Sequence, residues 1–179
     1  LMSQIHGAGV QVAKNGGIYP DTDAILTGVP GLLLGVRVAD CVPVLVHDKK
    51  EGIAGAIHCG WKPLVSGIVE RTIETMHHTW GSDPADIRIV LGPSAGPCCY
   101  EIGTDVASRL SPRSVTVRDG RLFGDLRNET VMRFKKSGIH RDAIELMTPC
   151  TICGESLFYS YRRDGKDSGR LMGFIMLRG

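Results

Sequence analysis

The chain carries the stretch Ile53-Ala54-Gly55-Ala56-Ile57-His58-Cys59-Gly60-Trp61-Lys62-Pro63. Its first five residues are continuously apolar and lead up to a histidine, a pattern typical of a strand buried on both faces. Gly60 suits a turn, and Pro63 suits the first position of a helix. Beyond Pro63, apolar residues recur at helical spacing as far as Trp80, and Gly81 ends the pattern. The sequence therefore predicts a strand, a turn and then one helix over 63–80.

Further short elements are expected on both sides of this unit. Asp119-Gly120 lies between two β-rich runs and signals a hairpin, and Asp125 can cap a helix that ends at Gly138. Apolar runs predict strands at 31–39, 42–47, 87–91, 115–117, 121–123, 144–147 and 171–177, with a short helix at 102–110. Since strands outnumber helices and include a hairpin, we expect an α/β (α+β) domain with a mixed β-sheet core flanked by helices.

Length and charge narrow the classes of function. With 179 residues, of which 42% are hydrophobic, the chain suits a single domain over 1–179 with a sizeable core. The 21 Lys and Arg residues nearly balance the 19 Asp and Glu residues, so no strong field draws the protein to nucleic acid or to a membrane. In addition, no apolar run approaches the roughly 20 residues that a membrane-spanning helix needs.

The number and spacing of the cysteines favour a reducing compartment. Six are present, but a chain of this length does not need disulfides for stability, and a bridge between the adjacent Cys98 and Cys99 would be strained. We therefore expect reduced thiols and a cytoplasmic protein.

Three residues of types that bind metals occupy similar settings. His6, Cys41 and His58 each lie beside a glycine or a loop signal at the edge of a strand-like run. Two imidazoles and one thiolate leave the fourth position of a tetrahedral ion open, as in catalytic rather than closed structural zinc sites. No compact spacing links the three, and an isolated histidine or cysteine more often has a purely structural role. The repeated setting at strand edges favours the metal-site hypothesis.

An anion site is a second hypothesis for the same region. The free backbone N–H groups at the start of the helix after His58 attract anions, and Lys62 adds a positive charge beside them. The alternative is that Gly60 makes the turn, Trp61 packs and Lys62 is simply solvated.

Several motifs, spread in order over nearly the whole chain, resemble those of the YfiH-type family, whose members are described both as purine nucleoside phosphorylases and as polyphenol oxidase laccases. The matching stretches are Gln4–Gly7, Thr22–Thr27, Ala39–Val44, Ile57–Trp61, Leu91–Pro93, Gly96–Glu101, Ser160–Asp164 and Gly169-Arg170. Relative to that family, the chain lacks the portion before the first histidine motif. The resemblance also implies a fold like that of the cytotoxic-necrotizing-factor-type cysteine hydrolases.

The resemblance implies a metal and a substrate. His6, Cys41 and His58 would bind one zinc ion, or copper in the oxidase description. The substrate would be a purine nucleoside, with phosphorolysis of adenosine, inosine, guanosine or methylthioadenosine and hydrolytic deamination of adenosine as the implied activities. Phosphate would be the second small-molecule partner.

One departure from the family pattern affects phosphate binding. The chain has Cys59 and Lys62-Pro63 where the family usually carries alanine and then arginine and glycine around the tryptophan. Lysine keeps the charge but lacks the planar fork of arginine that binds phosphate through two hydrogen bonds. We expect Arg162, Arg163 and Arg170 to be substitute phosphate ligands, although ion-paired surface arginines are the alternative.

Deamination also needs a proton shuttle beside the metal. Zinc lowers the pKa of bound water from about 15.7 to about 7, and zinc deaminases move protons through a carboxylate that is not a ligand. Asp40, next to Cys41, is the first candidate and Glu101 a more distant one. For Asp40, an Asx turn before Cys41 is an equally good interpretation.

The remaining cysteines leave two alternatives. Cys150-Thr151-Ile152-Cys153 has the spacing of a metal or redox pair and could form a closed four-cysteine site with Cys98 and Cys99, although adjacent ligands fit a tetrahedron poorly. A metal-free cysteine hydrolase with Cys41 as nucleophile and His58 as base is the other alternative, and it would have no need of His6. A domain that binds metal or a partner without catalysis is a further possibility.

Overall fold

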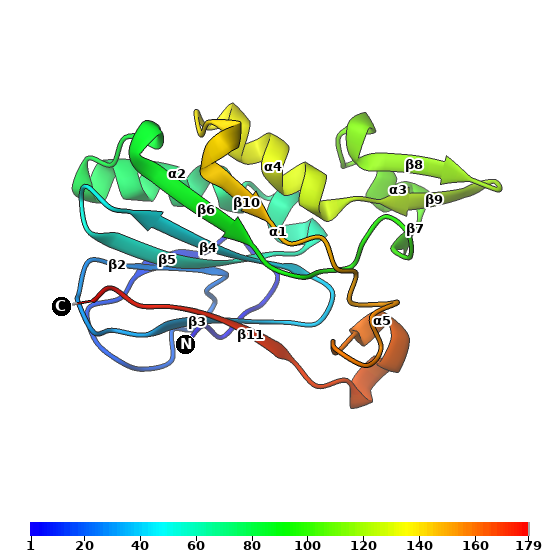
Figure 1. Cartoon of the computed structure of the whole chain (residues 1–179), viewed down its shortest axis with the longest axis horizontal. Coiled ribbons are helices and arrows are strands. Elements are labelled where there is room, and N and C mark those ends of the chain that lie inside the picture. The colour runs from blue at the N-terminus through cyan, green and yellow to red at the C-terminus, as the bar shows by residue number, and fades with distance from the viewer. Residues whose placement is uncertain (179) are drawn as a thin grey trace.

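The computed structural model describes residues 1–178, and they form three layers (Figure 1). Helices cover one face of a six-stranded sheet, and a two-stranded sheet covers the other face. The strands are β1 (Val10–Val12), β2 (Ala24–Thr27), β3 (Leu34–Val38), β4 (Val42–Asp48), β5 (Ile53–Cys59), β6 (Ile87–Leu91), β7 (Glu101–Ile102), β8 (Val115–Arg118), β9 (Arg121–Gly124), β10 (Ile144–Leu146) and β11 (Leu171–Ile175). The α-helices are α1 (Trp61–Val65), α2 (Ile68–Trp80), α3 (Thr104–Ala107), α4 (Leu126–Lys136) and α5 (Tyr161–Asp164).

The main sheet is mixed, as predicted. Its strand order is β1-β2-β5-β4-β6-β10, in which the pairs β1–β2 and β6–β10 are parallel and the other pairs antiparallel. A second sheet pairs β11 with β3, and a third has the order β7-β9-β8. The third sheet projects from the same end of the molecule as α5 (Figure 1). The expectation of a mixed β-sheet core flanked by helices is confirmed.

Strand β5 lies between two hydrophobic cores, and this explains its unbroken apolar sequence. All seven of its residues are buried. Ile57 packs in the core under the helices, whereas Ala56 belongs to the smaller core beneath β3 and β11. Gly55 allows the neighbouring strands to approach, since a Cβ there would lie 2.4 Å from Leu26 Cδ2. A fully buried isoleucine such as Ile57 contributes roughly 1.5–3 kcal/mol to folding, which helps to hold the layers together next to His58.

The helix predicted over 63–80 is in fact two helices. Gly67 adopts a left-handed conformation with φ +85° and separates α1 from α2. The prediction of one helix is wrong because the apolar spacing continues across the break, with Val65 before it and Ile68 after it. Helix α1 also begins at Trp61, two residues before Pro63. The predicted end at Gly81 is confirmed, again with a left-handed glycine.

The other local predictions fared unevenly. The hairpin over Asp119-Gly120 is confirmed, and the Asp125 side chain caps α4 by accepting a hydrogen bond from the Asn128 N–H. The helix expected at 102–110 is helical only at Thr104–Ala107, because Glu101–Ile102 pairs with β9 instead. Residues 3–7 are a loop, although they look like a strand, and β1 and β2 were not predicted.

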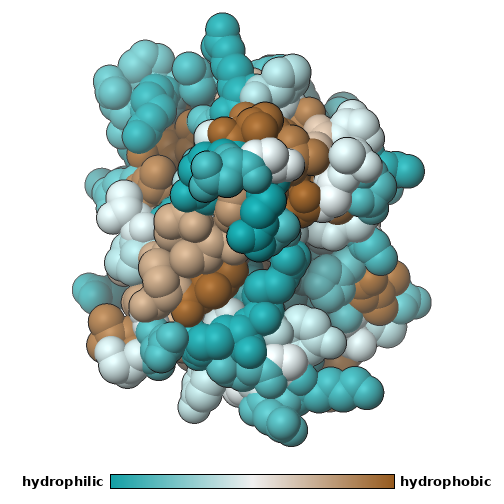
Figure 2. Space-filling model, turned by 90° about the vertical axis from the view of Figure 1, so that its right-hand side faces the viewer, coloured by the Kyte–Doolittle hydropathy of each residue, from teal (hydrophilic) through white to brown (hydrophobic). Residues whose placement is uncertain are grey.

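Within residues 1–178, none of the helices combines the length and the apolar character needed to cross a bilayer. The face that includes the β8–β9 hairpin and α5 is mixed, with hydrophobic patches separated by hydrophilic side chains (Figure 2).

Candidate functional site

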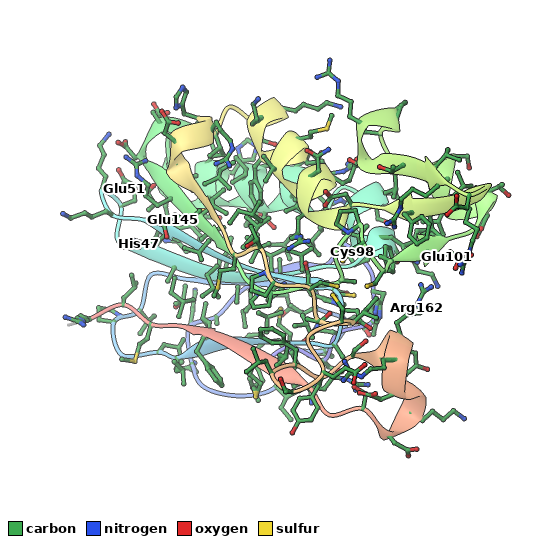
Figure 3. All side chains as sticks on the ribbon, turned by 45° about the vertical axis from the view of Figure 1, so that its right-hand side comes forward. His47, Glu51, Cys98, Glu101, Glu145 and Arg162 are labelled. Atoms are coloured by element: carbon green, nitrogen blue, oxygen red, sulfur yellow. The ribbon has the colours of Figure 1, made fainter. Side chains whose placement is uncertain are left out.

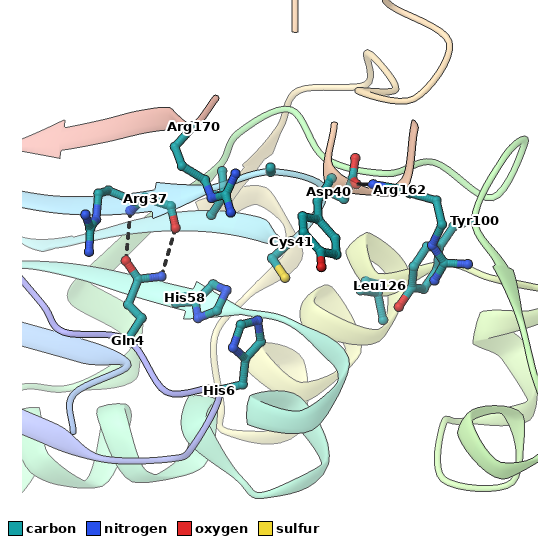
Figure 4. A pocket seen from close by; sticks show the side chains of 13 residues that line it. Gln4, His6, Arg37, Asp40, Cys41, His58, Tyr100, Leu126, Arg162 and Arg170 are labelled. Carbon is teal, nitrogen blue, oxygen red and sulfur yellow. Dashed lines mark hydrogen bonds between the residues drawn. The ribbon is translucent and has the colours of Figure 1, made fainter. Parts of the chain in front are cut away.

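A cavity of about 610 Å³ opens beside the carboxyl end of β5. His58 comes from β5, Cys41 from the turn between β3 and β4, and His6 from the loop before β1. The fold thus brings these three predicted ligands to one wall of the cavity, where their side chains point toward one another (Figure 4).

The three side chains have the spacing that one metal ion requires. Their ligand atoms all lie within 4.8 Å of one another. The rings of His6 and His58 have centroids 4.7 Å apart and are inclined at 76°. His58 is buried, Cys41 is half-buried and His6 is exposed, so the group opens to solvent on the side of His6. Such a set of one sulfur and two nitrogen donors suits zinc with an open fourth position.

Asp23 positions two of the three candidate ligands, and the sequence analysis missed it. Its carboxylate lies 2.7 Å from His58 Nδ1 and accepts backbone N–H bonds from the loop that carries His6. With Nδ1 donating to Asp23, Nε2 is the ring nitrogen of His58 that is left to bind a metal. Histidines that bind metals commonly donate their second N–H to a carboxylate in this way. The signals for Asp23 in the sequence were its place just before an apolar run and inside the matching stretch Thr22–Thr27.

The charges of this group favour a thiolate. Burial raises the pKa of Cys41, but hydrogen bonds from His58 and His6 outweigh it and lower the pKa to about 7. Burial lowers the pKa of His58, whereas Asp23 and Cys41 raise it, with a net value of about 9. For Asp23, the raising effect of burial is more than offset by His58 and by backbone N–H groups, so its pKa is lowered. A thiolate accessible near neutral pH is the form that binds metal.

Backbone conformation around the group is unusual. His6 and Asp40 have positive φ angles of 59° and 83°, which residues with side chains rarely adopt. Strained positions of this kind cluster at functional sites. Gly60 leaves the necessary room, because a Cβ there would lie 2.9 Å from Cys41 Sγ and 3.4 Å from His6 Cδ2.

Asp40 lines the cavity, but its carboxylate is bound by distant residues. It accepts hydrogen bonds from Thr151 Oγ1 at 2.7 Å, Ser160 Oγ at 3.1 Å and the Arg162 N–H at 2.6 Å. The Asx-turn interpretation is wrong, because all these donors are more than a hundred residues away in the chain. Asp40, the neighbour of Cys41 in sequence, instead anchors the loop before α5.

The candidate phosphate ligands separate into two groups. Arg162 and Arg170 line the cavity. Arg163 does not, since its guanidinium donates to the carbonyls of Thr151, Ile152 and Phe158 and pairs with Asp164. Lys62 is also outside the lining; it is exposed, with its Nζ 5.7 Å from the centroid of its neighbour Trp61. Lys62, at which the anion site was predicted, is therefore not part of the cavity lining, and α1 has only five residues.

Other lining residues were not predicted. Arg37 is the one exposed residue of the otherwise buried β3, and a single charged residue within an apolar run was the signal in the sequence. Its backbone exchanges two hydrogen bonds with the side chain of Gln4 (Figure 4). Tyr100 and Tyr161 also line the cavity, with Arg162 4.9 Å and Arg170 5.8 Å from their respective ring centroids. Glu101, the second candidate for a proton shuttle, is absent from the lining and pairs with Arg121.

A second group of possible ligands lies near the cavity end of the molecule. Cys98, Cys99, Cys150 and Cys153 bring all their sulfur atoms within 4.8 Å of one another. Figure 3 shows Cys98 at the same end as Glu101 and Arg162, with His47, Glu51 and Glu145 at the opposite end.

Comparison with known proteins agrees with the motifs. A family model described as multi-copper polyphenol oxidoreductase laccase matches residues 1–178. A purine nucleoside phosphorylase of Clostridium acetobutylicum is 37% identical over 160 residues, which cover 86% of this chain and 66% of that protein. A purine nucleoside phosphorylase of Deinococcus radiodurans is 35% identical over 180 residues, which cover 98% of this chain and 69% of that protein. The chain thus spans about two thirds of the length of these relatives.

A solved structure has the same fold. The crystal structure of the hypothetical protein YfiH from Bacillus licheniformis matches with a TM-score of 0.93 and 31% identity, covering 98% of this chain and 73% of that one. The resemblance to YfiH-type proteins inferred from the motifs is confirmed.

Proposed function

We propose that this chain, which belongs to the family described as multi-copper polyphenol oxidoreductase laccase, is a metal-dependent purine nucleoside enzyme. The main reaction would be phosphorolysis of adenosine, inosine, guanosine or methylthioadenosine, with hydrolytic deamination of adenosine as a second activity. One observation carries the proposal: three ligand side chains converge at the wall of a cavity that is also lined by arginines and tyrosines. The names of the curated relatives support the phosphorylase activity.

The metal would be zinc, held by His6, Cys41 and His58. The donor set fits this ion, and Asp23 supplies the carboxylate behind His58 that zinc-bound histidines commonly have. When bound, zinc would act as a Lewis acid and lower the pKa of a coordinated water. Asp40 remains our proposed proton shuttle for deamination, as the carboxylate of the cavity nearest in sequence to Cys41.

Phosphate would bind to the cavity arginines. Arg37, Arg162 and Arg170 line the cavity. The Arg162 guanidinium also donates to the Glu101 carbonyl and that of Arg170 to the Ser168 and Gly169 carbonyls, whereas within residues 1–178 the Arg37 guanidinium makes no hydrogen bond. In phosphorolysis, a phosphate oxygen bonds to C1′ of the ribose while the C1′–N9 bond breaks and its electron pair leaves with the purine. Arginines would hold the attacking anion in place, because their planar fork binds phosphate through two hydrogen bonds. We therefore assign this role to Arg37, Arg162 and Arg170 rather than to Lys62 or Arg163.

The aromatic and apolar lining suits a nucleoside. Tyr100 is buried and Tyr161 is half exposed, so the two rings offer surfaces against which a purine base can pack. Leu126 adds an apolar contact to the same lining. The combination of apolar surface with a few converging polar groups is typical of sites for small molecules. Nucleic acid and membranes are not expected partners, and a reducing cytoplasmic location remains a prediction.

Copper-dependent oxidation of phenols is the alternative, favoured by the name of the family. A set of two histidines and one cysteine also occurs in copper sites. The reduction of dioxygen to water, however, needs several coppers acting together. Within the described residues only one other group of potential ligands is found, and its donors are all thiols.

A metal-free cysteine hydrolase is a second alternative, because Asp23, His58 and Cys41 form a chain of acid, base and thiol. The fold likeness to cytotoxic-necrotizing-factor-type hydrolases remains a prediction. This alternative assigns no role to His6, whose substitution by alanine would then leave activity intact.

Product analysis tests the proposal. Zinc-loaded protein is incubated with adenosine or inosine, with and without phosphate, and the products are separated by chromatography. We expect free base and ribose 1-phosphate only when phosphate is present, and inosine from adenosine without phosphate. Turnover of a phenol by copper-loaded protein, with no product from either nucleoside, would overturn the proposal.

A further inference from the structure

Four of the six cysteines gather in a group that the proposed function does not use. Cys98 and Cys99 lie in the segment between β6 and β7, whereas Cys150 and Cys153 follow β10. All four sulfur atoms lie within 4.8 Å of one another, although the two pairs are far apart in the chain: 55 residues separate Cys98 from Cys153. Of the other two cysteines, Cys41 belongs to the candidate centre and Cys59 is buried in the main core.

The distance between sulfur atoms matches that in a zinc site with four thiolate ligands. Cys98 Sγ and Cys153 Sγ are 3.8 Å apart. A tetrahedral zinc ion with Zn–S bonds of about 2.3 Å holds its sulfur ligands about 3.8 Å from one another. A disulfide, in contrast, brings two sulfurs to about 2.05 Å. The adjacency of Cys98 and Cys99, which argues against a tetrahedral site from the sequence alone, does not keep either sulfur from the group.

Backbone N–H groups favour a negative charge on one member of the group, Cys150. The Gly96 N–H donates to Cys150 Sγ at 3.2 Å, and backbone N–H groups of Ile152 and Cys153 also face this sulfur. Such bonds favour the thiolate, which is the form that binds metal. Gly96 also makes room for the group, since a Cβ there would lie 3.2 Å from Cys98 Sγ and 3.1 Å from Cys150 Cβ.

Two arginines flank the group and complement the charge of a tetrathiolate centre. A zinc ion with four thiolates has a net charge of −2. Arg118 donates to the carbonyls of Pro97, at 2.6 Å, and Cys98, at 3.1 Å. The Arg127 guanidinium lies 2.6 Å from the position that a Cβ of Gly96 would occupy, and it donates to the carbonyl of Thr148. The two guanidinium groups would therefore offset part of the negative charge of a zinc ion with four thiolates.

We propose that Cys98, Cys99, Cys150 and Cys153 bind one zinc ion in a closed, structural site. Four protein ligands leave no position for a substrate, so the ion would connect segments rather than catalyse. The segments are already neighbours, since the Thr151 N–H donates to the Ser94 carbonyl at 3.1 Å. One of them leads to Tyr100 in the cavity wall, and the other carries Thr151, which bonds to Asp40. The ion would thus stabilise the cavity wall from behind.

Metal analysis of the whole chain tests this proposal, using zinc salt alone as the probe. After loading and removal of excess metal, we expect two zinc ions per wild-type chain. The double variant Cys150→Ser/Cys153→Ser and the single variant Cys41→Ala should each retain one. Cys59→Ala is the matched control, since it removes a cysteine outside both groups, and it should retain two. Unchanged zinc content in the double variant would overturn the proposal. If only Cys41→Ala lost zinc, the candidate catalytic centre would be the one zinc site of the two.

A measurement on the wild type covers the case in which the double variant fails to fold. Cys98 and Cys153 are exposed, so a maleimide should reach them freely in the absence of metal. We expect zinc to protect these two thiols and a chelator to restore their reactivity, with the labelled residues identified by peptide mass spectrometry. Rapid labelling of both in zinc-loaded protein, or a disulfide among the four cysteines under reducing conditions, would overturn the proposal. Neither outcome depends on the nucleoside activity.

Discussion

Asp23 and His58 are joined twice: the Asp23 carboxylate lies 2.7 Å from His58 Nδ1, and the Asp23 carbonyl accepts the His58 backbone N–H, also at 2.7 Å. The same carboxylate accepts the backbone N–H groups of Ile5, His6 and Gly7 at 2.7–3.3 Å. One buried side chain therefore fixes the orientation of one candidate ligand and the loop of another. Cys41, the remaining candidate ligand, comes from a third segment, the turn between β3 and β4.

Substitution of Asp23 by asparagine should weaken metal binding. The amide keeps the shape of the carboxylate but replaces one acceptor oxygen by a donor, so it cannot satisfy both His58 and the loop N–H groups. Loss of such a supporting group typically costs about 10- to 100-fold in metal affinity, and we expect Asp23→Asn to fall in this range in a competition titration with zinc. Asp21→Asn is the control, because Asp21 is exposed in the same turn. Equal affinities in the two variants would contradict the role given to Asp23.

Gly60→Ala tests the space around the thiol. Its φ of −81° is open to alanine, so the only obstacle is the added Cβ, 2.9 Å from Cys41 Sγ. We expect lower zinc affinity together with little change in the melting temperature of the metal-free protein. Gly16→Ala is the matched control, since a Cβ at Gly16 meets nothing within 4 Å. If Gly60→Ala bound zinc as tightly as this control, Cys41 would not be a ligand.

Phosphate binding should depend on the cavity arginines and not on Lys62. Hydrogen bonds to a charged group contribute about 1.5–3 kcal/mol each, so Arg37→Met should raise the KM for phosphate about tenfold or more while changing the KM for the nucleoside much less. Lys62→Met, a control outside the cavity, should leave both values near those of the wild type. Steady-state kinetics with varied phosphate measures this. A larger increase in the KM for phosphate in Lys62→Met than in Arg37→Met would instead place the anion site at the start of α1.

The break between α1 and α2 predicts a stability effect. Gly67 has φ +85°, which a residue with a Cβ adopts only with strain. We expect Gly67→Ala to lower the free energy of unfolding by about 1 kcal/mol or more, measured by urea denaturation of the metal-free protein. A gain in stability would instead indicate a single continuous helix through this position.

Local patterns predicted much of the fold. The apolar run of β5, the Asp119-Gly120 turn and the Asp125 cap each depend on neighbours in sequence, and each was predicted from the sequence. The break at Gly67 was missed because the helical spacing of apolar residues passes through it. Strands β1 and β2 were missed because short segments become strands only through pairing with β5 and with each other.

The candidate site was predictable only in part. His6, Cys41 and His58 were proposed from their residue types and settings, and the fold brings them together. The roles of Asp23 and Arg37 depend on partners far away in the sequence, so their residue types alone gave little indication. Similarly, the sequence does not show that Lys62 and Arg163 lie outside the cavity lining, whereas Arg162 and Arg170 belong to it.

The central claim is a metal ion held by His6, Cys41 and His58 with its fourth position open to the cavity. Anomalous diffraction from a crystal of zinc-loaded protein, recorded on both sides of the zinc absorption edge, tests it most directly. The account predicts an anomalous peak within bonding distance of all three side chains. A peak found only among Cys98, Cys99, Cys150 and Cys153, with none between the two imidazoles and the Cys41 thiol, would contradict it.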